Sequence, residues 1–281
     1  MRIRAAVVFL AVGLSAAALA QQKAPILKAP TEADWAALAK LPDFTGVWEQ
    51  TFGPPPGRAG ATNPPSGARG GAPAAGAGAP ARGGAPAAGR GRGAFAGPQL
   101  TPAYEEKRRA IMAKGAEDKE TANCLPPGMP GIMGQPYPME FLLTPGQVTI
   151  VIEAYSQVRH IYTDGRPLPE DPDEKFFGTS IGHWDNGTLV AETVGFSPLT
   201  ELAANTPHSG KMKIAERFRL TDPDTMSIET TITDPDALAA PYTSTRTLRR
   251  HRAWTIAEYV CEENNRNSVD AGGKAGINIK K

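Results

Sequence analysis

Residues 137–166 read YPMEFLLTPGQVTIVIEAYSQVRHIYTDGR, and the pattern of apolar residues and turns in this stretch decides the fold class. β-Branched and aromatic residues fill three segments, so we expect strands at 139–144, 147–155 and 157–163. A Thr-Pro-Gly turn separates the first two strands, and an Asp-Gly pair ends the third. Because short turns join antiparallel neighbours, the stretch predicts a β-meander.

The same pattern continues on both sides of this stretch. A helix is expected within 23–42 and another at 101–114, where Thr-Pro opens the segment. Further strands are expected at 44–48, 179–184, 188–196, 211–220, 225–233, 242–250 and 254–261. About ten strands joined mostly by short turns predict an all-β, antiparallel, lipocalin-like barrel, with a two-sheet β-sandwich as the alternative.

The N-terminus indicates export. Residues 1–20 combine two arginines, an apolar run and an Ala-Leu-Ala site, which is typical of a signal peptide cut after Ala20. The expected location is therefore the periplasm or the exterior, without membrane insertion. The chain has 30 basic and 29 acidic side chains, and this balance does not favour nucleic acid as a partner. The oligomeric state is left open.

The composition divides the chain further. Residues 21–52 hold the first helix and strand, and 99–265 hold the barrel. Between them, residues 53–98 are rich in Gly, Pro, Ala and Arg and repeat the octamer RGGAPAAG, so we expect a disordered insertion. Residues 266–281 are polar and predict a flexible tail.

Three expected strands place a carboxylate between apolar neighbours, at Glu192, Glu216 and Glu258. A buried carboxylate is costly unless it is paired, so such groups are candidates for catalysis or ligand binding. The structural alternative is a buried brace between Glu216 and an arginine such as Arg217, Arg219 or Arg246. His160 and Tyr162 share the strand face of Val158, which is expected to point inward.

These side chains give a candidate site inside the barrel. The proposed catalytic residues are Glu216, His160, Tyr162, Glu192 and His208, and the proposed substrate-binding residues are Tyr155, Glu153, Arg159, His183, Trp184, Glu258 and Arg246. No metal-binding spacing, phosphate loop or dinucleotide fingerprint is present, so no metal or cofactor is expected. The sequence leaves one alternative open, in which dispersed His and Glu side chains meet in space and bind a metal. In an exported chain, the two cysteines predict a Cys124–Cys261 disulfide.

Two resemblances to known proteins extend these predictions. Gly46-Val47-Trp48 resembles the first strand of lipocalins, which implies that Trp48 closes one barrel end under a late arginine, Arg246, Arg249 or Arg250. The chain also resembles an uncharacterised family of exported bacterial proteins that is common in bacteria degrading aromatic compounds. The motifs that carry this resemblance are PDFTGVW (42–48), CLPPGMP (124–130), PYPMEF (136–141), RHIYTDGR (159–166), SIGHW (180–184), PHS (207–209) and ERF (216–218).

The family resemblance implies no settled activity. Its members usually have His at the position of Thr179 and a Glu-Gly pair near Asp185, and this chain departs from both. We therefore carry three hypotheses. The first is a cofactor-independent lyase or isomerase, of decarboxylase or retro-aldol type, acting on a small aromatic acid or alcohol. The second is a periplasmic lipocalin-like protein that binds a small molecule without turnover, and the third is a structural envelope protein.

Deletion of residues 53–98 should leave the stability of the protein almost unchanged, because this segment lacks the apolar periodicity that a packed element needs. The melting temperatures of the full chain and the deletion variant compare the two directly. A fall of more than a few degrees would show that the insertion packs against the barrel.

Overall fold

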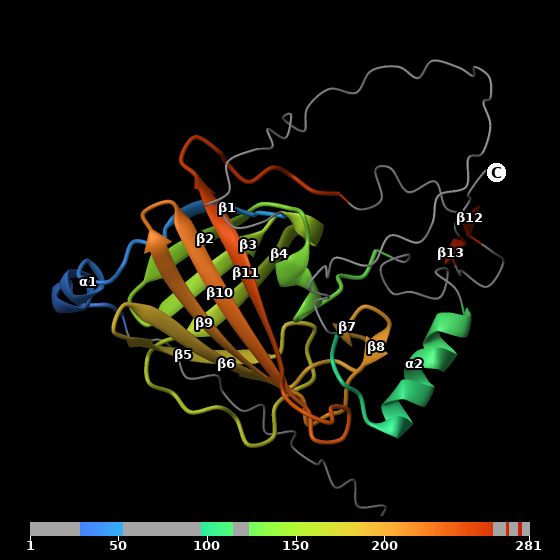
Figure 1. The fold of residues 1–281 in the computed structure, drawn as a ribbon. Helices are drawn as coiled ribbons and strands as arrows, with labels where there is room; N and C mark the ends of the chain where they lie inside the picture. The colour runs from blue at the N-terminus through green and yellow to red at the C-terminus, as the bar shows by residue number, and fades with distance from the viewer. Residues whose placement is uncertain (1–28, 53–96, 115–123, 261–267, 270–274, 277–281) are drawn as a thin grey trace, which may run out of the picture.

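The computed structural model describes residues 29–52, 97–114, 124–260, 268–269 and 275–276. The expected signal peptide lies outside these residues, as do almost all of the insertion at 53–98 and most of the tail at 266–281. No helix in the described ranges has both the length and the apolar character needed to cross a membrane. The described chain is mostly β-sheet (Figure 1), so the all-β prediction is confirmed.

Nine strands close into one barrel, in the order β1-β11-β10-β9-β6-β5-β4-β3-β2, with β2 pairing back onto β1. They are β1 (Gly46–Gln50), β2 (Met139–Thr144), β3 (Gln147–Ile152), β4 (Gln157–Tyr162), β5 (Thr179–Asp185), β6 (Thr188–Val194), β9 (Lys213–Asp222), β10 (Thr225–Thr233) and β11 (Tyr242–His251). Closure pairs both edges of every strand. The barrel prediction is confirmed, and the sandwich alternative is wrong.

Smaller elements do not belong to the barrel wall. They are α1 (Glu32–Leu38), α2 (Pro102–Lys114), the 3-10 turns η3 (Gly131–Gly134) and η4 (Ala154–Ser156), and the short pairs β7 (Glu201–Ala203) with β8 (Thr206–Pro207) and β12 (Ser268–Val269) with β13 (Ala275–Gly276). Thr31 caps α1 as its sequence suggests, with a capping box to Asp34. Helix α2 lies beside the β7–β8 pair (Figure 1).

One strand pair departs from the predicted antiparallel order. β4 and β5 run parallel, and their register joins only Ile161 to Ser180 and Tyr162 to Ile181. The connection at 163–178 is long enough to return the chain to the starting end of β4, whereas the hairpin turns elsewhere reverse its direction. The strand predicted at 147–155 also ends early, at Ile152, because Tyr155 and Ser156 have φ values of 58° and 49°.

The last predicted strand, at 254–261, is not formed. Its described residues, 254–260, have no regular secondary structure and no strand partner. The reason is the closure of the barrel: one edge of β11 pairs with β10 and the other with β1, so a following segment finds no free edge.

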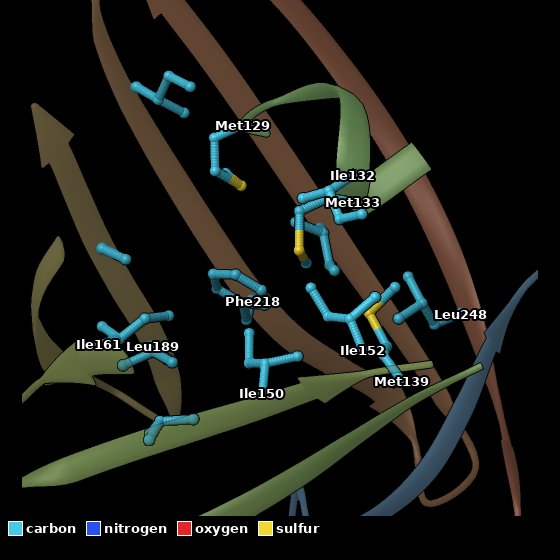
Figure 2. Close-up of a cluster of buried hydrophobic side chains, with 14 of the residues drawn as sticks. Met129, Ile132, Met133, Met139, Ile150, Ile152, Ile161, Leu189, Phe218 and Leu248 are labelled. Atoms are coloured by element: carbon cyan, nitrogen blue, oxygen red, sulfur yellow. The ribbon is translucent and has the colours of Figure 1, made fainter. Parts of the chain in front are cut away.

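Apolar side chains fill the barrel interior. In β9 buried and exposed residues alternate strictly, and Ile214 and Phe218 point inward. They meet inward residues of the opposite wall, such as Phe141, whose ring centroid lies 6.1 Å from that of Phe218. Ile214, Phe218 and Phe141 belong to one buried cluster. Figure 2 shows Phe218 in this cluster together with Ile150, Ile152, Met139 and Leu248.

The loop before β2 completes this core. Met129, Ile132 and Met133 are at most 2% exposed and point from the η3 turn into the cluster around Phe218 (Figure 2). The sequence CLPPGMPGIMG has the Pro and Gly content of a loop but the apolar content of a core segment. The loop therefore acts as a plug, and we call residues 127–135 the plug loop.

Trp48 and Arg250 close the barrel near the start of β1. Trp48 is fully buried, and the Arg250 guanidinium lies 4.5 Å from its ring centroid. Arg250 also donates to the Asp43 carboxylate at 2.9 Å and to the Asp43 carbonyl. Burial alone would raise the pKa of Asp43, but hydrogen bonds from Thr45 and Arg250 outweigh it and hold that pKa below its usual value. Arg250 is thus the late arginine that the lipocalin resemblance implies.

Arg250→Met should lower the free energy of unfolding by about 2 kcal/mol, because it removes a cation–π contact and charge-assisted hydrogen bonds. The control is Arg249→Met, which removes the same charge from the exposed face of the same strand and should cost less than about 0.5 kcal/mol. Urea unfolding of both variants gives the comparison. Equal losses would mean that Arg250 stabilises the fold only through its charge.

Candidate functional site

The three carboxylates expected on the inner wall do not lie together. Glu216 is 1% exposed and points into the barrel, as predicted. Glu192 is exposed, because β6 buries Leu189, Ala191 and Thr193 and turns the alternate residues outward. Glu258 is also exposed and lies outside any strand. The inward placement predicted for these two residues is wrong.

His160 also faces outward. β4 buries Arg159 and Ile161, so the alternate residues Val158 and His160 lie on the outer surface. His160 Nδ1 is 3.0 Å from Gln147 Nε2, on the neighbouring strand. The prediction that Val158 and His160 point into the barrel is therefore wrong, because the opposite face of β4 points inward.

Tyr162 continues this outer row. Its ring stacks near that of His160, with centroids 6.3 Å apart, and the Arg166 guanidinium lies 3.9 Å from its centroid. Arg166 in turn pairs with Asp164, and this bond, which outweighs the opposing effect of burial, lowers the pKa of the Asp164 carboxyl. His160 and Tyr162 thus form a surface cluster, separated from Glu216 by the barrel wall.

Glu216 has a full set of partners. Arg159 Nη1 donates to Glu216 Oε1 at 3.2 Å, and Nη2 donates to Oε2; both side chains are 1% exposed. Nη2 also lies 3.2 Å from Thr193 Oγ1 and 3.4 Å from Ser180 Oγ. These four side chains form a polar belt along the inner wall from β4 to β9.

The polar belt corresponds to the structural alternative for Glu216, with a different arginine from those expected. Arg217 and Arg219 are exposed because they alternate with Glu216 along β9. Arg159, which was predicted to bind substrate, uses both of its Nη groups in the belt, and its buried Nε has no hydrogen-bond partner among the described residues. Two desolvated charges in bidentate contact stabilise each other, so this arrangement indicates a brace.

Glu153 and Tyr155 hold the segment that follows β11. Glu153 Oε2 accepts a hydrogen bond from the Ala257 amide at 3.0 Å, and the ring of Tyr155 lies 5.2 Å from that of Tyr259. Burial raises the pKa values of both phenols, with a further contribution from neighbouring tyrosines. Cys124 belongs to a disulfide, whereas Cys261, its predicted partner, lies outside the described residues.

His208 joins two parts of the loop region between β6 and β9. Its Nδ1 is 2.8 Å from the Ser209 carbonyl, and its Nε2 is 3.0 Å from the Ser197 carbonyl and 2.9 Å from Thr200 Oγ1. Ser209 is itself held by the buried Asp234 carboxylate, at 2.6 Å from both its amide and its hydroxyl. These contacts fix the loop between β6 and β9 that contains β7, so His208 has a positioning role.

His183 and Trp184 lie far from this region. Trp184 packs against Phe44, just before β1, with ring centroids 5.1 Å apart. His183 is exposed on the outer face of β5. Neither side chain shares a cavity with the other predicted site residues.

A cavity of about 1030 Å³ lies at the end of the barrel where β1 stops and β11 begins. Its wall is formed by the plug loop, β7 and the inner faces of β10 and β11. The apolar lining includes Phe52, Leu199, Leu202 and Ile232, and the polar lining includes Gln50, Gln135, Glu201, Thr230, Tyr242, Ser244 and Arg246. This combination of an apolar wall with a few polar groups is typical of small-molecule sites.

Of the site residues predicted from the sequence, Arg246 is the one that lines this cavity. Tyr242, Ser244 and Arg246 alternate along β11 and face the same side as the buried Leu248, so they line the cavity together. The guanidinium lies against Gly134 of the plug loop: a Cβ added there would be 3.3 Å from Nη2. Among the described residues, Arg246 has no ion pair.

Most of the other lining residues were not predicted from the sequence. Tyr242 and Ser244 could have been predicted, because they lie on the same face of their strand as Arg246. No local signal identifies Gln50 or Leu202, because the loop connections that bring them to the cavity are set by the closed barrel.

Known proteins do not identify the chain. No family model matches the sequence, and no curated protein matches it; the family resemblance thus stays a prediction. Within the described residues, no group of three or more His, Cys, Asp or Glu side chains is placed to hold a metal ion. The chemistry of the site must therefore be inferred from the cavity and its lining.

Glu216→Gln should lower the free energy of unfolding by about 3–5 kcal/mol, because it leaves the Arg159 charge buried without a counter-charge. The double variant Arg159→Met/Glu216→Leu should recover much of this loss, since it removes both charges. Glu192→Gln, on the exposed face of β6, is the control and should change stability by less than about 0.5 kcal/mol. If Glu216→Gln unfolds like the wild type, the polar belt is not a brace.

Proposed function

We propose that the protein binds a small, partly aromatic acid or alcohol in the cavity at the barrel end. The cavity itself carries the proposal. Its volume of about 1030 Å³ accommodates a small organic molecule, and its lining joins an apolar surface to a few hydrogen-bonding groups. A purely structural barrel has no need to leave such a space beside a fully packed core.

The location of the cavity favours binding over the catalysis first expected inside the barrel. The lumen is filled by the plug loop and by inward side chains such as Phe218 and Ile150, so a substrate cannot reach Glu216. His160 and Glu192, the intended partners of Glu216, lie on the outer surface. The binding hypothesis needs none of these residues.

The cofactor-independent lyase or isomerase remains the second candidate, because one carboxylate lies in the cavity wall. Glu201 and Tyr242 line the same cavity as Arg246, which supplies an acid-base pair beside a cation. In this version, Glu201 transfers the proton and Arg246 orients the substrate. Glu201 Oε2 accepts a hydrogen bond from the Asn205 amide at 2.9 Å, which fixes the direction of the carboxylate.

Calorimetric titration of the full chain with cinnamate, benzoate and the two corresponding alcohols tests the proposal. At least one probe should bind with a dissociation constant of about 1 mM or lower. Ser244→Phe, which fills the cavity from β11, should abolish binding. Thr243→Phe, the neighbouring substitution on the exposed face, should leave binding unchanged.

Two results would count against the proposal. Absence of binding by all four probes would exclude the proposed ligand class, and equal binding by Ser244→Phe and the wild type would place the ligand elsewhere. Chromatography of the probes after incubation separates the two candidates: probe recovered unchanged supports binding alone, whereas conversion that is lost in Glu201→Gln supports turnover.

A further inference from the structure

Arg246 places a positive charge in the wall of a mainly apolar cavity. It is half-buried, and among the described residues it has neither an ion pair nor a hydrogen bond. The other arginines that are buried on inward strand faces behave differently: Arg159 pairs with Glu216, and Arg250 pairs with Asp43. A partly desolvated guanidinium is costly without an acceptor, so the cavity is suited to a ligand that supplies one.

Gly134 explains how the guanidinium is held. A Cβ at this position would lie 3.3 Å from Arg246 Nη2, 3.5 Å from Nε and 3.8 Å from Cζ, so the guanidinium lies beside Gly134, on the side where a side chain would project. Gly134 is not among the glycines with positive φ, and its backbone conformation suits other residues. A side chain at this position would therefore displace the Arg246 guanidinium by a few tenths of an ångström, whereas glycine leaves it in place.

Thr230 provides a second, independent observation. It lines the cavity and is 2% exposed, and its Oγ1 has no hydrogen-bond partner among the described residues. Ser244 is its registered neighbour on β11, two residues before Arg246. Because a buried hydroxyl without a partner destabilises a fold, a polar group of the ligand at this point restores the missing bond.

We infer that the ligand is a carboxylate, bound through its oxygens by the Arg246 guanidinium, and that Gly134 is a positioning residue for this contact. The inference rests on the proposed function and chooses the acid over the alcohol. A planar carboxylate matches the two parallel N–H groups of a guanidinium, whereas an alcohol accepts only a single bond. The apolar wall around Leu202 and Ile232 then receives the rest of the ligand.

The experiment compares the affinities of cinnamate and cinnamyl alcohol, which share their apolar body, in the same calorimetric titration. In the wild type, cinnamate should bind at least about tenfold tighter than the alcohol. Arg246→Met should reduce this ratio to about one by weakening the acid alone, since the apolar wall is unchanged. Arg249→Met, which removes an exposed arginine from the same strand, should leave the ratio as in the wild type.

Gly134→Ala tests the positioning role and does not depend on the stability of the Arg246 variant. The added methyl should shift the guanidinium and lower the acid-to-alcohol ratio by about threefold to tenfold, with the alcohol affinity retained. Its melting temperature should match that of the wild type.

The outcomes separate this inference from the proposed function. If both probes bind equally to the wild type, or if Arg246→Met and Gly134→Ala keep the preference for the acid, the carboxylate assignment is wrong and the binding function stands. If the alcohol binds tighter than the acid, the cavity selects neutral ligands and the assignment is again wrong. If the four aromatic probes all fail to bind, the proposed function itself fails.

Discussion

The polar belt between Arg159 and Glu216 crosses the weakest seam of the barrel. The other neighbouring strands of the barrel are antiparallel and are in register at three or more residue pairs, but β4 and β5 are in register at only two. Arg159 starts on β4, contacts Ser180 on β5 and Thr193 on β6, and ends on Glu216 of β9. The side chains thus tie together four strands at the point where backbone hydrogen bonding is sparse. A buried ion pair contributes little net stability, so we propose that its role here is to fix which strands meet.

This seam and the plug loop together determine where a ligand has space. In the polar belt, the buried polar side chains of one wall pair with each other. Met129, Ile132 and Met133 of the plug loop fill the barrel lumen. Burial of each of these side chains contributes about 1.5–3 kcal/mol, which offsets the entropy of ordering a loop rich in glycine and proline. What remains is the space beside the plug loop, where Gly134 lies against Arg246 of β11. Figure 2 shows the plug side chains packed in the core.

The fold was more predictable from the sequence than the site, and strand parity explains both results. In β9 the alternation of Ile214, Glu216 and Phe218 with charged residues allowed only one inward face. In β4 apolar residues occur on both faces, and Val158, which suggested the inward face, is 45% exposed. Parity relates neighbours along a strand, but packing against distant strands decides which face is inside. Barrel closure is also set by residues far apart in the sequence. The strand predicted at 254–261 has a suitable composition, but the edge of β11 that it would join is already paired with β1.

The arrangement of Arg246 also limits which reaction the cavity could perform. An ion pair stabilises a carboxylate in its ground state, and decarboxylation must disperse that same charge into the rest of the molecule. A guanidinium bound to the carboxylate therefore raises the barrier for loss of CO₂. If turnover occurs, the carboxylate bound by Arg246 only orients the substrate and does not react. The reacting bond then lies nearer to Glu201 and Tyr242, which line the same cavity. Under the proposed carboxylate contact, proton transfer or retro-aldol cleavage therefore fits the cavity better than decarboxylation does.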